Sequence, residues 1–381
     1  MASSGEAVTV GQRTEGTLAR ARLLGVLWWL VRLAAALFVF VGALQLMKTG
    51  AASLSILHQG GLLVQNAGST LGLGWLGALL VLSGSPIAAT SLTLVAAGEQ
   101  AAAGADRFTE LQGFTMLTGS RLGAAFVVLV TAALFALRAP DGERKAPVTC
   151  AMFALFATAM IYIPAAFLGA GLLRWDTFHS LDLTLPGGFV SLLDLVYGGL
   201  LERAESHPPA LVFLVGLACL LAAFKLIDTV LPTLDPGTLR QSRAAMLTRK
   251  WPMFFLGSLV ALVTMSISVA LTVLVPLVAK RYVKVDHVLP YILGANITTL
   301  GDTMFAAFTL DSPAAVRIVL AEVIATSVLS IVLLAFFYPQ ILKAMWHLQV
   351  LGARSARRLA VFTAVLFLFP VTIIGLSALF G

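Results

Sequence analysis

The segment Leu289–Phe308, LPYILGANITTLGDTMFAAF, places polar side chains inside a run whose ends are apolar enough for a membrane helix. The interruption combines two glycines, an amide, two hydroxyls and a carboxylate: Gly294, Asn296, Thr298, Thr299, Gly301 and Asp302. A lipid-facing helix avoids such residues, because unpaired polar groups are costly in hydrocarbon. Hydroxyls and carbonyls at a helix break can bind a dehydrated cation or hydrogen-bond an oxyanion. We therefore expect a broken helix that lines a substrate cavity.

Arg121 is a second candidate for chemistry within an apolar run. Its planar guanidinium matches phosphate or another oxyanion, so it can contact an anion or supply a fixed charge where a cation would otherwise bind. The alternative is an ion pair with Asp302 that locks two parts of the molecule together.

Four other ionisable residues at membrane depth have structural explanations. We expect Glu322 to pair with Arg317 or with a backbone group near the membrane interface. Lys225 and Asp228 are three residues apart and can pair on one helix face. Arg32 lies near the end of its apolar run, so its long side chain can carry the charge to the surface.

The composition is that of an integral membrane protein. Of the 381 residues, 59% are hydrophobic and 11% are charged, and the mean hydropathy is +0.96. Soluble domains carry about 25% charged residues. Several runs exceed the roughly 20 apolar residues that a membrane-spanning helix needs, so we predict an all-α membrane protein.

The charged residues and cysteines exclude several other functions. The net charge of +7 comes from short loops between apolar runs, which is typical of topology signals and predicts no nucleic-acid partner. Cys150 and Cys219 lie in apolar runs and predict no disulfide framework. The sequence contains no metal-ligand spacing and no catalytic constellation, so we expect neither an enzyme nor a bound cofactor.

An internal repeat predicts the architecture. Three segments recur in the same order, the first two at a separation of 180 positions and the third at 175. The pairs are LQLMKTGAASL (44) and FKLIDTVLPTL (224), LGALLVLSGSPIAATSLTL (76) and LGSLVALVTMSISVALTVL (256), and LTGSRLGAAF (117) and ILGANITTLG (292).

The loop charges predict that the two copies cross the membrane in opposite directions. Net charge changes from about +1 before the first copy to about −3 over 174–205, before the second. It changes from about −2 over 99–110 to about +2 over 280–286. Because Lys/Arg excess marks the cytoplasmic side, this reversal indicates inverted-topology repeats.

Two apolar stretches are predicted to be re-entrant hairpins rather than crossings. Residues 251–279 have basic residues on both flanks, and a hairpin keeps both flanks in the cytoplasm. Its tip is expected at Met265–Ser268. The first-half counterpart, 71–97, has its tip at Ser85–Ala88, where Pro86 favours a break.

These assignments leave about seven full crossings: 23–47, 113–137, 148–172, 209–234, 288–310, 315–339 and 359–380. Apolar pieces near 51–66 and 188–200 are expected at the interface or as partial helices. The predicted layout is a flexible tail (1–22), repeat 1 (23–172), an extracytoplasmic connector (173–208), repeat 2 (209–340), and a cytoplasmic basic loop with a final helix (341–381). We expect a multi-pass plasma-membrane protein with a cytoplasmic N-terminus and an extracytoplasmic C-terminus.

The motifs resemble those of the sodium-dependent phosphate cotransporters of the type II Na/Pi family. In that family each of two inverted repeats has a Gln-Ser-Ser-Ser-Ala-Thr-Thr hairpin motif followed by Gly-Ala-Asn-Ile-Gly-Thr-Thr. GANITT at Gly294–Thr299 matches the second motif except at Thr298. The resemblance covers about 37–135 and 215–340.

The match departs from the family at several positions that surround substrate and sodium there. In our sequence alignment Ser85 and Met265 replace the two glutamines, and Arg121 replaces the first-half asparagine. Together with the ionisable residues at membrane depth, the candidate substrate and ion ligands are Ser85, Thr90, Ser91, Arg121, Ser266, Ser268, Asn296, Thr298, Thr299 and Asp302. A sodium ion is expected near Ser266, Ser268, Thr298 and Thr299.

The expected function is secondary active transport of phosphate or another small oxyanion, coupled to a Na+ gradient by alternating access. Two alternatives remain. The same fold can carry a different solute, coupled to protons through Asp302 or Glu322, or the protein can be a non-transporting membrane scaffold or receptor.

Overall fold

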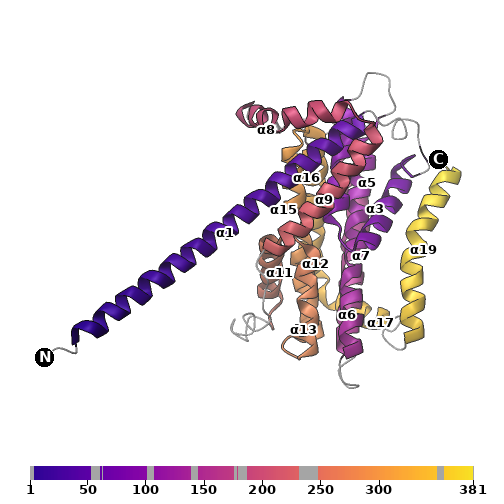
Figure 1. Ribbon diagram of the computed structural model, residues 1–381. Coiled ribbons are helices and arrows are strands. Elements are labelled where there is room, and N and C mark those ends of the chain that lie inside the picture. The colour runs from indigo at the N-terminus through magenta and orange to yellow at the C-terminus, as the bar shows by residue number, and fades with distance from the viewer. Residues whose placement is uncertain are drawn as a thin grey trace.

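The structure is a computed structural model that describes residues 4–52, 63–100, 107–138, 145–175, 187–230, 248–349 and 356–380, together with Gly61 and Phe178. Every regular element in these residues is helical (Figure 1). The first-half helices are α1 (Ser4–Ala52), α3 (Ala67–Val81), α4 (Ser85–Gln100), α5 (Glu110–Ala124), α6 (Phe126–Arg138), α7 (Lys145–Arg174) and α8 (Gly187–Glu205). The second-half helices are α9 (Pro209–Val230), α11 (Lys250–Thr264), α12 (Ile267–Thr272), α13 (Leu274–Ala279), the 3-10 turn η1 (Val285–His287), α14 (Val288–Thr298), α15 (Gly301–Thr309), α16 (Pro313–Phe336), α17 (Tyr338–Leu348) and α19 (Ala356–Phe380).

Six helical segments of the described chain are long and apolar enough to cross a membrane, as expected for a multi-pass membrane protein. They are Leu24–Ala52, Glu110–Arg138, Lys145–Arg174, Pro209–Val230, Pro313–Phe336 and Arg357–Leu379. The predicted crossing at 288–310 consists of two shorter helices, α14 and α15, with a break at Thr299–Leu300.

The periphery differs from the core in burial. Of the 16 residues of α4, 13 are buried, whereas only 5 of the 22 residues of α9 are buried, and α19 is buried even less. Exposed apolar faces of this kind suit contact with lipid rather than water.

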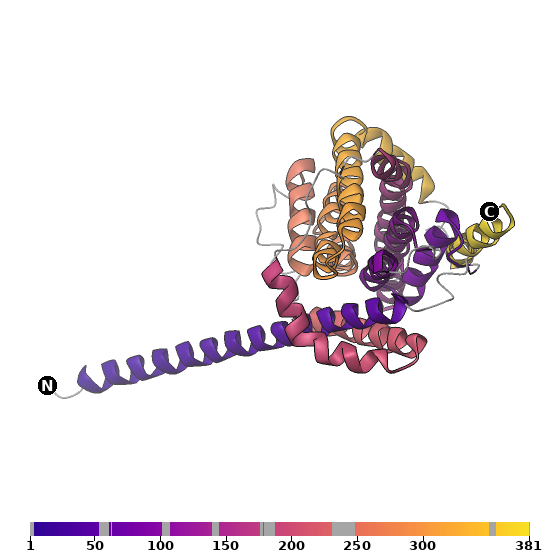
Figure 2. The ribbon, with the colours of Figure 1, turned by 90° about the horizontal axis from the view of Figure 1, so that it is seen from above.

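The N-terminal prediction differs from the structure. We expected a flexible tail over 1–22, but α1 begins at Ser4 and projects away from the bundle (Figures 1 and 2). No proline interrupts Ser4–Arg22, so the helix of the first crossing can continue toward the N-terminus. The predicted piece at 188–200 forms α8, which lies across one end of the bundle (Figure 1). Most of the piece at 51–66 lies outside the described residues.

Contacts between helix termini define one end of the bundle. Glu99, near the end of α4, accepts a hydrogen bond of 2.5 Å from Ser312, just before α16. Gln112, in the first turn of α5, donates to the carbonyl of Val64, just before α3 (2.7 Å). An ion pair joins the first turns of α5 and α16. The start of α3 and the end of α4 therefore lie at the same end.

The opposite end is defined by the C-terminal part of α16. Lys250, the first residue of α11, donates to the Leu334 carbonyl near the end of α16 (3.4 Å). Trp346 of α17 donates to the carboxylate of Asp286, in η1 after α13 (2.7 Å). The segment α11–α13 therefore starts and finishes at the end of the bundle opposite to α3–α4 (Figure 1).

The segments α3–α4 and α11–α13 each break at a residue with a left-handed backbone conformation. α3 is capped by Leu82 (φ 57°) and α11 by Met265 (φ 45°). This conformation turns the chain out of a helix, and it costs a non-glycine residue about 1–2 kcal/mol. Pro86 lies in the first turn of α4, where its missing N–H is tolerated. Pro276 lies three residues after Val273, so the helical stretch that follows the break at Met265 divides into α12 and α13.

Glycines allow close backbone approach at matching places in the two halves. A methyl group at Gly74 of α3 would lie 2.0 Å from the carbonyl oxygen of Met116 in α5, and one at Gly257 of α11 would lie 2.0 Å from that of Tyr291 in α14. The partner helices approach through glycines in the same way. A methyl group at Gly119 of α5 would meet the Leu71 carbonyl of α3, and one at Gly294 of α14 would meet the Phe254 carbonyl of α11.

These contacts correct the predicted alignment of the second repeated segment, LGALLVLSGSPIAATSLTL (76) with LGSLVALVTMSISVALTVL (256). Gly74 and Gly257 are 183 positions apart, as are the capping residues Leu82 and Met265, whereas the sequence comparison used 180. A shift of three residues is close to one helical turn, so apolar helices align almost equally well either way. The first break consequently lies three residues before the predicted tip at Ser85.

Candidate functional site

The breaks of the two halves lie against each other. The Ser268 hydroxyl in α12 donates to the carbonyl of Leu82, the residue that caps α3, over 3.5 Å. Ser266 caps the start of α12, and its hydroxyl accepts from the Val269 amide (3.3 Å). The interrupted backbone of both halves is therefore placed at one location in the bundle.

A cavity of about 500 Å³ lies beside these breaks. Its polar lining consists of Ser83, Ser85, Ser266, Asp228 and Asp302. The remaining lining is apolar and comes mainly from α1 and α9: Trp29, Leu33, Leu37, Phe40, Phe224, Ile227, Val263, Met265 and Phe305. The cavity thus has hydroxyls and carboxylates on one side and a hydrocarbon wall on the other.

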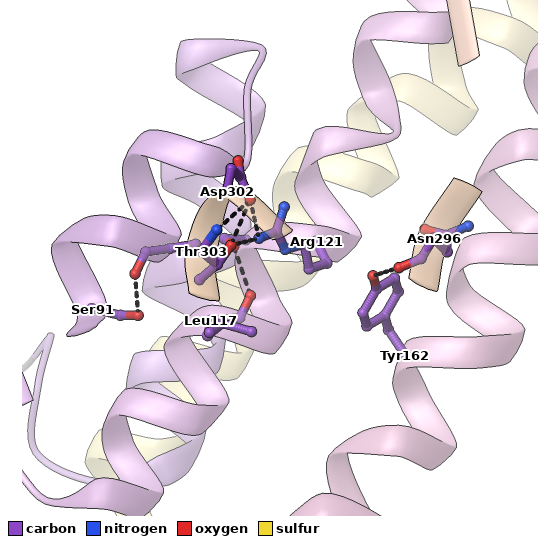
Figure 3. Close-up of polar contacts among 9 residues, drawn as sticks. Ser91, Leu117, Arg121, Tyr162, Asn296, Asp302 and Thr303 are labelled. Atoms are coloured by element: carbon purple, nitrogen blue, oxygen red, sulfur yellow. Dashed lines mark hydrogen bonds and ion pairs between the residues drawn. The ribbon is translucent and has the colours of Figure 1, made fainter. Parts of the chain in front are cut away.

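Arg121 and Asp302 form a buried ion pair between α5 and α15 (Figure 3). Arg121 Nη2 lies 3.5 Å from Asp302 Oδ1 and also donates to the Thr303 hydroxyl. The Thr303 amide and hydroxyl donate to the same carboxylate oxygen (2.6 and 2.8 Å). Only 2% of Arg121 and 6% of Asp302 are exposed. The ion pair considered from the sequence is present, and Thr303 completes it.

Asn296 occupies the place on α14 that Arg121 occupies on α5, 175 positions earlier. Its amide nitrogen donates to the Ile292 carbonyl (2.9 Å) and lies 3.5 Å from the Thr158 hydroxyl. The Tyr162 hydroxyl on α7 donates to the backbone carbonyl of Asn296 (2.9 Å; Figure 3). The second-half position is therefore held by neutral hydrogen bonds rather than by charge.

Glu322 does not make the ion pair that we predicted. Arg317, five residues before Glu322 in the sequence, pairs instead with Glu110 at the end of the bundle. Glu322 is fully buried in α16, and one carboxyl oxygen lies 3.0 Å from the Thr118 hydroxyl. That hydroxyl also lies 2.9 Å from the Phe114 carbonyl.

Buried polar atoms without partners concentrate in this region. Nine buried side-chain nitrogen or oxygen atoms of the described residues lack a hydrogen-bond partner. Six of them belong to the candidate site: Arg121 Nε and Nη1, Asn296 Oδ1, Thr299 Oγ1, Asp302 Oδ2 and Glu322 Oε1. Buried polar groups are normally satisfied. A set that contains both donors and acceptors can receive a polar solute, ions or water.

Three predicted ligands are instead used in local packing. Thr90 and Ser91 donate to carbonyls of their own helix (2.8 and 2.7 Å), as such residues often do in helices. The Thr298 hydroxyl donates to the Ser258 carbonyl on α11 (2.6 Å). Of the other predicted ligands, Ser85 and Ser266 line the cavity, and Ser268 joins the two breaks.

Sequence reasoning missed four residues of the site. Ser83 was hidden by the alignment, because the corrected spacing pairs it with Ser266. Thr303 is next to Asp302, and its proximity was the available signal. Thr118 and Tyr162 are recognised only from contacts with residues more than 130 positions away.

The predicted pair of Lys225 and Asp228 is wrong. Both residues are exposed on α9, and the described residues contain no ion pair between them. Asp228 lines the cavity instead. Arg32, predicted to reach the surface, donates to the hydroxyl of Thr229, the residue after Asp228 on α9 (3.2 Å).

Comparison with known proteins identifies no relative: no family model, no curated protein and no solved structure matches the chain. No group of three His, Cys, Asp or Glu side chains in the described residues is arranged to hold a metal ion.

Proposed function

We propose that this protein is a secondary active transporter that uses alternating access and is driven by a cation gradient. The proposal takes α3–α4 and α11–α13 as re-entrant hairpins in two inverted repeats. It is supported by their opposite starting ends, by the matching breaks at Leu82 and Met265, and by the matching glycine contacts. Inverted repeats with interrupted helices commonly place the substrate where the interruptions meet.

The observation that carries the proposal is the set of unpartnered buried polar atoms on Arg121, Asp302 and Glu322, of which Asp302 also lines the cavity beside the two breaks. A scaffold protein gains nothing from leaving Arg121 and Asp302 incompletely hydrogen-bonded, because each unmet buried group costs about 1–3 kcal/mol. A transporter needs such groups, since the solute satisfies them only while it is bound.

The leading candidate solute is phosphate or another small oxyanion. Arg121 has two free nitrogen donors, which suit an anion. The corrected spacing also strengthens the resemblance to the type II Na/Pi motif. Ser83 and Ser85 then correspond to Ser266 and Ser268, and Leu82 and Met265 stand where that family has glutamine. The hydroxyls at the breaks are the proposed ligands for Na+.

A specific observation favours a second candidate, a larger solute with an apolar part. Phosphate would fill only a small part of the 500 Å³ cavity, which has the size of a typical small-molecule pocket. The ionisable groups that line it are the carboxylates Asp228 and Asp302, and Arg121 lies behind Asp302. An amphiphilic cation would match this lining.

Uptake by proteoliposomes tests the proposal. We expect radiolabelled phosphate to accumulate under an inward Na+ or H+ gradient, and the variant Arg121→Ala to lose this accumulation. If phosphate does not enter, competition by amphiphilic cations in a binding assay tests the second candidate. Binding without flux for every solute would overturn the transporter proposal. We further propose a plasma-membrane location with the N-terminus in the cytoplasm, to be tested by labelling Lys284 from outside intact cells, where no labelling is expected.

A further inference from the structure

Glu322 is a buried carboxyl group without a counter-ion of its own. None of its surface is exposed, and its Oε1 atom has no hydrogen-bond partner among the described residues. Its Oε2 atom lies 3.0 Å from the Thr118 hydroxyl, which lies 2.9 Å from the Phe114 carbonyl. No other polar contact of this carboxyl group is present in the described residues.

The single hydrogen of Thr118 limits what this contact can supply to Glu322. The hydroxyl lies within reach of two acceptors, the Phe114 carbonyl four residues earlier and Glu322 Oε2, and it can donate fully to only one of them. When it donates to Phe114, the contact with Glu322 is a hydrogen bond if Glu322 is protonated and donates to Thr118. When it donates to Glu322, this is the one hydrogen bond that an ionised Glu322 receives.

Asp302 shows what an ionised carboxylate requires in this protein. It receives two hydrogen bonds from Thr303 and an ion pair from Arg121. Glu322 has no comparable set. The charged group that acts on it is Arg121 from α5, which is already paired with Asp302 from α15, and Tyr162 from α7 lies near all three. One cation therefore serves two carboxyl groups. A proton on Glu322 makes the cluster neutral, which buried charges at this depth require.

We infer that Glu322 is the proton-binding site of this protein, and that the proton it exchanges is the coupling ion. The inference rests on the proposed transport function. When the site opens to water, the O–H bond of Glu322 breaks and the proton passes to a water molecule on that side, leaving a carboxylate.

Arg121 links this proton to the solute. Thr118 and Arg121 are three residues apart on α5 and so share a face, which places the Glu322 carboxyl near the guanidinium. Nε and Nη1 of Arg121 are free while Glu322 is protonated, and they are available to an anion. An ionised Glu322 competes for them. Protonation and anion binding therefore favour each other, as a symport requires.

Infrared spectroscopy of the purified protein tests the protonation directly, without any transport. We expect the carbonyl band of a buried protonated carboxyl group at neutral pH, and Glu322→Gln should remove it. Glu110→Gln is the matched control, because Glu110 is an ion-paired carboxylate on the neighbouring α5, and it should leave the band intact. Thr118→Val should shift the band to higher frequency, since the acid loses its acceptor. Absence of the band, or a band that persists in Glu322→Gln, overturns the inference.

Proteoliposomes then test the coupling. Glutamine can donate to Thr118 as the protonated acid does, so we expect Glu322→Gln to fold and melt like the wild type. It should retain exchange of solute between the two sides but lose accumulation driven by a pH gradient by about tenfold or more, within the range typical of coupled sites. Accumulation at the wild-type level would overturn the inference. If the wild type carries no phosphate, the oxyanion proposal fails, and the infrared result still decides whether Glu322 holds the proton.

Discussion

Arg121 and Asn296 stand at equivalent places in the two halves of the molecule and have opposite surroundings. Each follows a packing glycine by two residues, Gly119 in one case and Gly294 in the other. Arg121 joins a charged pair, whereas Asn296 makes only neutral hydrogen bonds. The helix packing is thus common to both halves, and the ionisable chemistry is not.

The partner of Arg121 explains why only one half can carry the charge. Asp302 lies 175 positions after Val127, so the first half has an apolar residue at the position equivalent to the carboxylate. The ion pair joins one residue of each half and occurs once. The two halves therefore differ in charge at positions where their helix packing is alike.

The largest expected effect comes from removing the charge of Arg121. Arg121→Met leaves Asp302 buried without its cation, which typically destabilises a protein by about 3–5 kcal/mol. Asn296→Met, at the equivalent position, removes only neutral hydrogen bonds and should cost about 1–3 kcal/mol. Thermal unfolding of the detergent-purified variants measures the difference.

A second change identifies the cause of that loss. Adding Asp302→Asn to Arg121→Met removes the unpaired carboxylate and should restore most of the lost stability. If Arg121→Met melts no lower than Asn296→Met, the two halves do not differ in the way described.

The next effect tests the part that the halves share. Gly74→Ala and Gly257→Ala should each destabilise the protein by about 1–3 kcal/mol, because the added methyl meets a backbone carbonyl at 2.0 Å. The two losses should be similar. Gly171→Ala is the control, since nothing lies within 4 Å of a methyl group there, and alanine favours the helix. A large loss in one half only would contradict a common scaffold.

The fold was largely predictable because its signals are long and local. Six of the seven predicted crossings coincide with helices long and apolar enough to span a membrane, and the polar interruption after Asn296 marked a real break. The alignment of the second repeated segment failed by three residues, because leucine-rich helices offer similar faces one turn apart. The contacts of the glycines settle it, and these are visible only in three dimensions.

The candidate site was predictable in its charges and less so in its partners. The ion pair of Arg121 and Asp302 was one of the two interpretations drawn from the sequence, because few charges are available at membrane depth. Glu322 was assigned to Arg317 because that residue is near in sequence, yet Arg317 meets Glu110, 207 positions away. Contacts between distant segments depend on how the helices pack, and no local pattern records them.

A smaller effect concerns the strained capping residues. Met265→Gly should stabilise the protein by about 1 kcal/mol, because glycine adopts a positive φ without strain. Leu82→Gly should gain less, since Leu82 is partly buried and its packing is lost, whereas Met265 is 38% exposed. Met265→Val should be less stable than the wild type, because β-branched residues tolerate this conformation poorly. A loss of stability in Met265→Gly would show that methionine has a packing role at this break.

The smallest effect concerns His287, at the start of α14, where the corresponding residue at the start of α5 is Gln112. Gln112 caps the start of α5 together with Thr109, and the residue 175 positions later is His287, before α14. Burial is the main cause that lowers the pKa of His287, and Lys284 adds to it, while Asp286 opposes it. The folded protein therefore holds this proton less well than the unfolded chain, whose histidine has a pKa of about 6.5. Stability is complete above that pH and falls as the pH drops through it. We expect the melting temperature of the wild type to fall more than that of His287→Gln between pH 8 and about pH 5, whereas equal falls would mean that His287 is not the group that titrates.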